Sequence, residues 1–182
     1  MKQEIKSVKL TSKNRLKISL QGEVMYGNEE VFEETNKYTK FTEPSQSLLT
    51  AFKLLLPHFL IHIKSNVVKI DADYIKGQKA LKDNKLKDFA VTGFTLSGEG
   101  DDEKVVLEGK IMEEDKGMPV KTLKIKLYGN DDYPFSGNLV EDLAVVIDEV
   151  EQFLEGNFSK SPQTEIDFEE DEEEDELLEE EF

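Results

Sequence analysis

The sequence predicts an α+β fold in which an antiparallel sheet of five or six strands packs against two main helices. Three observations lead to this prediction. Apolar and polar residues alternate near the N-terminus, two longer stretches repeat apolar residues at three- and four-residue steps, and short links rich in turn-forming residues separate three apolar segments. We expect residues 1–157 to form a single globular domain and residues 158–182 a flexible acidic tail.

A β-hairpin is expected at the N-terminus. Apolar side chains alternate with polar ones over residues 8–10 and 16–20, and the polar residues 11–14 between them suit a turn. If the even positions face the core, the opposite face carries a basic group. This group consists of Lys9, Lys13, Arg15 and Lys17. A further strand is expected over residues 31–41.

A buried helix is expected over residues 48–64, where apolar residues recur at helical spacing. Ser45 and Ser47 are suitable N-caps, and Pro57 should kink or restart the helix because proline has no N–H to donate. A short strand over residues 67–70 and a lysine-rich stretch over residues 75–88 should follow.

The second half of the chain predicts three antiparallel strands and a helix. The strands cover residues 89–97, 104–113 and 120–128, and their short links favour a meander. The helix should begin at Asn138, with Glu141 completing a capping box, and should end at Gly156. No internal repeat is visible in the sequence.

Charge is distributed unevenly along the 182 residues, whose net charge is -17. Residues 1–90 contain 16 basic and 11 acidic side chains, whereas residues 91–160 contain 7 basic and 16 acidic ones. Residues 161–182 contain 13 acidic side chains and no basic one. Such an asymmetry bears on the partners of a protein and not on its fold.

Composition excludes several classes of protein. The chain has no cysteine, which rules out thiol catalysis and cysteine-ligated zinc and fits a reducing compartment. Its N-terminus lacks the apolar run of a signal peptide, and its most apolar stretch, residues 54–63, is shorter than the ~20 residues that span a bilayer. We therefore expect a soluble, cytoplasmic protein without a membrane partner.

Two pairs of residues have metal-ligand spacing. His58 and His62 are four residues apart on one helix face, but no glutamate lies between them and their helix is apolar, which favours packing or capping roles. Asp71 and Asp73 have the spacing of paired magnesium ligands, but no phosphate-binding loop accompanies them. We predict no metal, no cofactor and no enzymatic activity.

Basic residues interleaved with aromatic ones favour binding of single-stranded nucleic acid, because cations follow phosphates and rings stack on bases. The alternative is an ordinary solvated surface. The candidate nucleic-acid-binding residues are Lys9, Lys13, Arg15, Lys17, Lys37, Tyr38, Lys40, Phe41, Lys76, Lys79 and Lys82.

The C-terminal residues 167–182 are almost entirely acidic and end in Phe182. This segment resembles the acidic tails of bacterial and phage single-stranded DNA-binding proteins. Bacterial members have a proline before the final phenylalanine, where this chain has Glu181, so the phage members are more similar. The resemblance is confined to the tail, and it implies an OB-like barrel as the alternative fold.

A tethered polyanion competes with nucleic acid for a basic surface on the same molecule. Once displaced, its end offers a ring and carboxylates to partner proteins, here through Glu179, Glu180, Glu181 and Phe182. Our hypothesis is a single-stranded DNA-binding protein of phage or bacterial replication or recombination. The alternative is an acidic decoy or chaperone that binds basic proteins through its acids between residues 131 and 155 and through its tail.

Overall fold

The structure is a computed structural model that describes residues 4–11, 15–26, 29–40, 45–113, 116–129 and 133–155; for residue 15 and residues 22–40 it describes the backbone alone. The strands are β1 (Glu4–Leu10), β2 (Arg15–Tyr26), β3 (Glu29–Lys40), β4 (Phe89–Ser97), β5 (Lys104–Glu113), β6 (Lys116–Lys121) and β7 (Ile125–Lys126). The helices are α1 (Gln46–Leu54), α2 (Leu56–His62), α3 (Ala72–Lys76) and α4 (Ser136–Leu154), with 3₁₀ turns η1 (Lys79–Leu81), η2 (Asn84–Leu86) and η3 (Gly100–Asp102).

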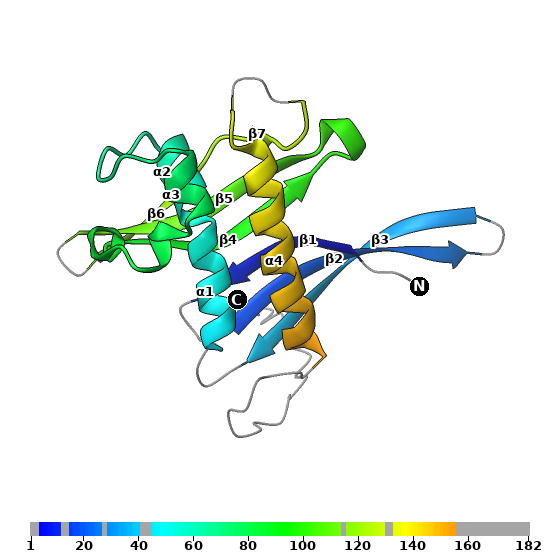
Figure 1. The fold of residues 1–182 in the computed structure, drawn as a ribbon. Coiled ribbons are helices and arrows are strands. Elements are labelled where there is room, and N and C mark those ends of the chain that lie inside the picture. Colours follow the sequence, from blue (N-terminus) through cyan, green and yellow to red (C-terminus); the bar gives the residue numbers. More distant parts are fainter. Residues whose placement is uncertain are drawn as a thin grey trace, which may run out of the picture.

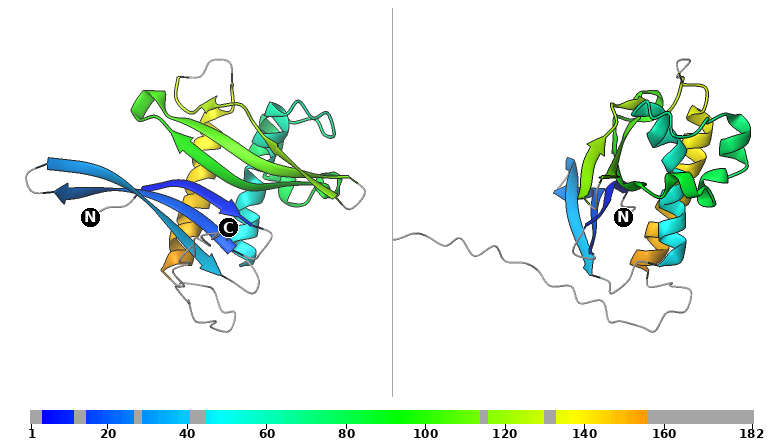
Figure 2. Two further views of the ribbon diagram at one scale, coloured as in Figure 1. Left: turned by 180° about the vertical axis from the view of Figure 1, so that it is seen from behind. Right: turned by 90° about the vertical axis from the view of Figure 1, so that its left-hand side faces the viewer.

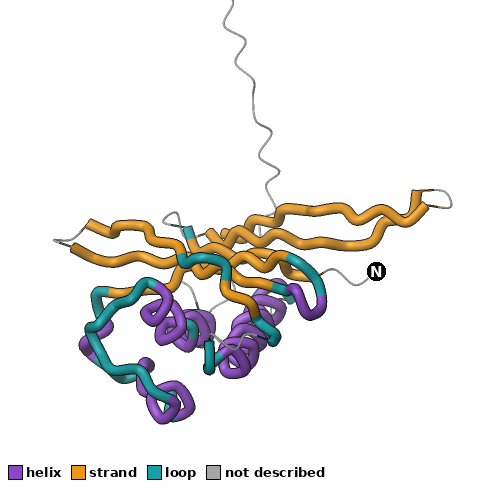
Figure 3. The backbone as a smooth tube through the Cα atoms, turned by 90° about the horizontal axis from the view of Figure 1, so that it is seen from above, coloured by secondary structure: helices purple, strands orange, loops and turns teal. Residues whose placement is uncertain are grey.

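The sheet is open and antiparallel, with strand order β3-β2-β1-β4-β5-β6, and β7 pairs with β5 (Figure 1). The predicted α+β class, with six main strands and two main helices, is confirmed. In the described residues β3 and β6 are the two ends of the sheet and do not pair with each other, so the alternative of an OB-like barrel is wrong. The helices lie on one side of the strand layer (Figure 3).

The core fills the space between this sheet and the helices. Leu48, Phe59, Leu139 and Val146 are fully buried on the helices. Val8, Ile18, Phe94 and Leu107 meet them from the four central strands and are also buried. Each such side chain contributes roughly 1.5–3 kcal/mol by leaving water. The periodicity of the sequence therefore determines which face of the sheet the helices cover.

The fold contains the same topology twice. Three antiparallel strands and a helix form the first half, β1-β2-β3-α1, and the same arrangement recurs in β4-β5-β6-α4. The halves join where β1 pairs antiparallel with β4, with Val8 opposite Phe94. Each joining strand has an irregular register two residues earlier, at Lys6 in β1 and at Thr92 in β4. An approximate two-fold axis therefore relates the halves, although no repeat is visible in the sequence.

Several predicted elements are confirmed. β1 and β2 pair antiparallel as the expected hairpin, and β4 and β5 have the predicted bounds. The long central helix is interrupted as predicted: α1 ends before Leu55, and α2 restarts with Pro57 in its first turn. Ser45 caps α1 by accepting a hydrogen bond from the Leu48 amide at 3.2 Å.

Three local predictions are wrong. Residues 67–70 form an irregular segment, because Val68 and Ile70 pack against the core without a strand beside them. The strand expected over 120–128 is two strands, β6 and β7, and β6 begins earlier because an edge strand tolerates Pro119. Helix α4 starts at Ser136 without a side-chain cap, so Asn138 lies inside its first turn. The predicted end at Gly156 and the tail lie outside the described residues.

Candidate nucleic-acid interface

No helix of the described ranges covers the second face of the sheet, which we call the uncovered face (Figures 2 and 3). Strand alternation decides which side chains reach it. Val8, Ile18 and Leu107 are buried beneath the helices, so their neighbours along each strand point the other way. The lysines that reach the uncovered face come from five strands: Lys9 (β1), Lys17 (β2), Lys104 and Lys110 (β5), Lys121 (β6) and Lys126 (β7).

Strand register aligns three of these lysines in one row across the sheet. Lys17 lies opposite Lys9, and Lys9 lies opposite Gly93 of β4. Gly93 in turn lies opposite Glu108, which lies opposite Lys121. Since neighbouring strands are about 4.8 Å apart, a row across five strands spans roughly 19 Å. The row combines residues from both halves of the fold.

Gly93 holds β1 and β4 close together at the centre of this row. A Cβ at position 93 would lie 2.4 Å from the Val8 carbonyl oxygen and 3.1 Å from the Lys9 Cα, both backbone atoms. Because glycine has no side chain, the Lys9 side chain crosses over β4. Its Nζ then lies 2.8 Å from Oε2 of Glu108 on the next strand.

Glu108 binds two lysines at once. Its Oε1 lies 2.5 Å from Lys121 Nζ, while its Oε2 contacts Lys9. Burial disfavours the ionised carboxylate, but the hydrogen bonds and charges of Lys121 and Lys9 outweigh this and hold the pKa of Glu108 below its ordinary value. The Glu108 side chain is 13% exposed, against 50% for Lys9 and 62% for Lys121. An anion arriving from solvent therefore meets the ammonium groups before the carboxylate.

The end of β6 is fixed by a buried hydroxyl next to Lys121. Thr122 Oγ1 accepts a hydrogen bond from the Leu107 amide at 3.0 Å, and the Thr122 amide donates to the Leu107 carbonyl at 3.0 Å. These bonds anchor the chain to β5 just after Lys121. The next residue, Leu123, is 85% exposed, so the anchoring depends on Thr122.

Strand register brings further predicted residues beside this row. Along the β2–β3 ladder, Lys17 lies opposite Tyr38, and Arg15 lies opposite Lys40. Lys37 lies opposite a buried position of β2. The backbone thus brings Lys9, Lys17 and Tyr38 into neighbouring positions on adjacent strands. The remaining predicted residues Lys13, Phe41, Glu179, Glu180, Glu181 and Phe182 lie outside the described residues.

The other predicted lysines belong to a different surface. Lys76 ends α3, Lys79 begins η1 and Lys82 follows it, all within a connector on the helical side of the sheet (Figure 3). The structure therefore does not bring Lys76, Lys79 and Lys82 together with the uncovered face. We call residues 64–88 the lysine connector.

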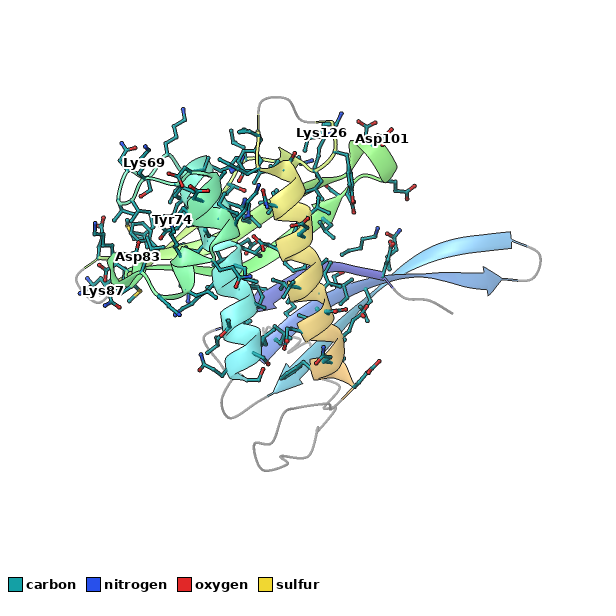
Figure 4. The ribbon with its side chains drawn as sticks, in the orientation of Figure 1. Lys69, Tyr74, Asp83, Lys87, Asp101 and Lys126 are labelled. Atoms are coloured by element: carbon teal, nitrogen blue, oxygen red, sulfur yellow. The ribbon has the colours of Figure 1, made fainter. Side chains whose placement is uncertain are left out.

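A tyrosine and two aspartates hold the lysine connector in place. Tyr74 donates a hydrogen bond to Asp83 Oδ2 at 2.8 Å (Figure 4), and Asp71 accepts one from the Tyr74 amide at 2.9 Å. The Lys85 amide and the Tyr74 hydroxyl lower the pKa of Asp83, and burial, together with Asp83, raises the pKa of Tyr74. Asp71 is thus the cap of α3, and Asp73 lies in its first turn.

Sequence reasoning missed the charged residues that the second half of the fold contributes to the uncovered face, among them Glu108, Lys110 and Lys121. The signal was present, because Val105 and Leu107 alternate with Val106 and Glu108 along a strand that the sequence predicts. Reading that strand for its polar face would have identified Glu108 and Lys110. Lys121 was harder to find because the bounds of its strand were predicted wrongly.

The two histidines of the apolar helix take part in packing. His58 is fully buried, with Nδ1 2.5 Å from the Tyr133 hydroxyl and Nε2 2.9 Å from Asp142 Oδ2. Both ring nitrogens of His58 are thus hydrogen-bonded, Nδ1 to the Tyr133 hydroxyl and Nε2 to the Asp142 carboxylate. His62 donates from Nδ1 to the His58 carbonyl at 2.8 Å. The described residues contain no group of three or more potential metal ligands.

Negative charge gathers on the opposite side of the molecule. Helix α4 carries five acidic side chains and no basic one: Glu141, Asp142, Asp148, Glu149 and Glu151. It packs beside α1 on the helical side of the sheet (Figure 1). In the described part of the molecule, lysines therefore lie on both sides of the sheet, on the uncovered face and in the lysine connector, whereas α4 carries acids alone.

Comparisons with protein families, curated proteins and solved structures found no match. Among the helices described, none combines the length and the apolar character needed to cross a membrane.

Proposed function

We propose that the protein binds single-stranded DNA on the uncovered face of its sheet. The row of lysines from both halves of the fold is the observation that carries this proposal. Lys9 and Lys17 lie on adjacent strands, and Lys121 extends the row to the edge strand β6. Cations in such a row suit a chain of phosphates, and their affinity comes largely from the release of counterions.

The shape of this face favours a single strand over a duplex. A sheet face lets the exposed bases of a single strand lie flat against side chains, whereas the bases of a duplex are stacked and paired inside it. Tyr38 occupies the register position next to Lys17 and is our candidate for base stacking. A row of roughly 19 Å matches a few nucleotides.

Glu108 gives this interface a built-in competitor. A phosphate that binds Lys9 or Lys121 replaces an ion pair with Glu108, so the net gain in free energy is smaller than for an unpaired lysine. The exchange makes binding weak and reversible at each position. Such weak contacts suit a protein that covers DNA and is displaced by the enzymes that follow.

The acidic tail completes the proposal. Residues 161–182, with 13 acidic side chains, compete with DNA for the same cations, and Glu179–Phe182 recruit partner proteins of replication or recombination once DNA displaces them. Replacing Glu179, Glu180 and Glu181 by glutamine should tighten DNA binding at low salt and have less effect at high salt, because salt screens the competition.

The test is a titration of fluorescent oligo-dT with the full chain at two salt concentrations. Lys9→Ala combined with Lys17→Ala should weaken binding, and its salt slope should be smaller by about 0.7 for each phosphate that the variant no longer neutralises. The matched control, Lys79→Ala with Lys82→Ala in the lysine connector, removes the same charge and should have little effect. Absence of binding by the unaltered chain at low salt would reject the proposal.

A second candidate function is specifically favoured by α4. Its exposed acids Glu141, Asp148 and Glu151 form a negative surface that could imitate DNA toward a basic protein. Polylysine titrated against the full chain separates the two functions. If Glu141→Gln with Asp148→Asn weakens polylysine binding while oligo-dT does not bind at all, the decoy function replaces our first proposal.

A further inference from the structure

The two edges of the sheet differ in how well they are protected. In the described part of the chain, β3 has one strand neighbour, β2, and all twelve of its residues pair with β2 without a register break. At the other edge, β6 has six residues and includes Pro119. Short edge strands and proline discourage pairing with another chain, whereas a long regular edge invites it. By this criterion β3 is the open edge.

Part of β3 lies in a ribbon that extends beyond the rest of the sheet. β1 reaches β2 only as far as Gln21, so residues 22–26 of β2 pair with residues 29–33 of β3 and, among the described strands, with nothing else. Figure 1 shows this ribbon projecting past β1. A two-stranded ribbon is marginally stable in water, and a third strand beside it is the usual remedy.

The residue order of β3 suits antiparallel pairing with itself. In an antiparallel pair, two residues that face each other either both form hydrogen bonds to each other or both do not. On an edge strand, alternate residues point their N–H and C=O groups outward. The strand therefore pairs with its own copy only in registers whose two-fold axis passes through a residue and not between two residues. Centring on Thr35 places Glu30 opposite Lys40, Glu33 opposite Lys37 and Phe32 opposite Tyr38. These are the charge and aromatic pairs that stabilise antiparallel strands.

Neighbouring registers lack this complementarity. Centring on Glu34 sets two glutamates against each other on the axis and leaves no glutamate opposite a lysine. Centring on Asn36 also leaves no glutamate opposite a lysine. The Thr35 register produces four ion pairs across the two-fold, because each of the two pairs occurs twice.

We propose that two copies of this chain form a dimer by antiparallel pairing of β3 with β3, centred on Thr35. The two-fold axis of such a pair is perpendicular to the sheet, so the uncovered faces of both copies lie on the same side. The result is one sheet that runs from β6 of one copy to β6 of the other. This proposal stands independently of DNA binding and is tested without DNA.

Crosslinking tests the register directly, because the chain has no cysteine of its own. Thr35→Cys faces its own copy across the axis at a distance that a disulfide spans, so mild oxidation should yield a covalent dimer. Thr39→Cys is the matched control. In this register its copies are eight residues apart along the strand, about 27 Å, and should not crosslink. Equal crosslinking of the two variants would overturn the register.

Charge reversal tests the interface in solution by sedimentation velocity. Lys37→Glu with Lys40→Glu should convert the dimer to monomer, and so should Glu30→Lys with Glu33→Lys. An equimolar mixture of the two variants should recover the dimer, since opposite charges then face each other again. This recovery excludes misfolding as the cause of dissociation. Lys79→Glu with Lys82→Glu in the lysine connector should remain dimeric. An unaltered chain that stays monomeric, or dimers that survive both reversals, would overturn the proposal.

Discussion

The two halves of the fold share one topology and differ in nearly everything else. The helix of the first half breaks at Leu55 ahead of Pro57, whereas α4 runs unbroken through 19 residues. The first half ends in the open edge β3, and the second ends in β6 with Pro119. Residues 1–90 are basic and residues 91–160 are acidic. The comparison shows that the two halves share the burial of apolar strand residues beneath helices, whereas their surface charges and edge strands differ.

The strongest test of this comparison breaks the junction between the halves. Gly93→Ala introduces a Cβ 2.4 Å from the Val8 carbonyl oxygen, so β1 and β4 have to separate. We expect unfolding in urea to show a loss of about 3 kcal/mol, the upper range for overpacking.

Gly137→Ala is the control, because a Cβ there has no atom within 4 Å and lies in the first turn of α4. It should leave stability unchanged or raise it by up to ~1 kcal/mol. If Gly93→Ala is as stable as this control, the close approach at the junction is unimportant.

A second test loosens the packing of α2 against α4 and the residues just before it. Tyr133→Phe leaves Nδ1 of the buried His58 without its hydrogen bond, while Asp142 still accepts from Nε2. We expect a loss of about 1–3 kcal/mol, because an unsatisfied buried polar atom bears its full desolvation cost. Tyr128→Phe, at an exposed tyrosine, is the matched change and should cost little. Equal stability of the two variants would mean that the network contributes nothing.

A third test concerns the row to which both halves contribute. Glu108→Gln keeps the shape of the side chain but removes the charge that Lys9 and Lys121 share. On the proposed function, oligo-dT binding at low salt should tighten by about threefold, which corresponds to less than 1 kcal/mol. Glu151→Gln on α4 changes the net charge equally and should tighten binding less. A weaker complex for Glu108→Gln would contradict the exchange of ion pairs.

The smallest effect is expected from pH. Burial lowers the pKa of His62 from 6.5, although its bond to the His58 carbonyl opposes this. Below pH 6.5 the unfolded chain therefore binds a proton that the folded chain does not, and stability should fall as pH drops from 7.5 to 5.5. His62→Gln should flatten this part of the pH profile, measured as urea midpoints. An unchanged slope would assign the pH dependence to another group.

Much of the fold was predictable because burial imposes a period on the sequence. Both long helices, the break before Pro57 and strands β4 and β5 follow from apolar spacing. Residues 67–70 resemble a strand in sequence, because a short and mostly apolar segment can pack against the core either as a strand or as an irregular segment. The repeat is hidden in the sequence because Val8 and Phe94 occupy equivalent places with different side chains.

The candidate site was predictable only in part. Lys9 and Lys17 follow from alternation within one hairpin, which is local information. Their alignment with Glu108 depends on β1 pairing with β4, a contact between residues more than eighty positions apart. The sequence could not show that Lys79 and Lys82 lie away from the uncovered face, because charge composition contains no information on which side of the sheet a segment packs.

The central place of β1 has a consequence for synthesis on the ribosome. This strand leaves the ribosome before the other described strands, yet one of its two neighbours, β4, begins only at residue 89. At about 5–20 residues per second, the nascent chain waits several seconds or longer before that neighbour exists. During this interval one side of β1 lacks its partner strand, and the emerging β1–β2–β3 meander can associate wrongly with other chains. Chaperones that shield nascent chains should therefore matter more for the yield of this protein than for one whose paired strands all follow each other directly in the sequence.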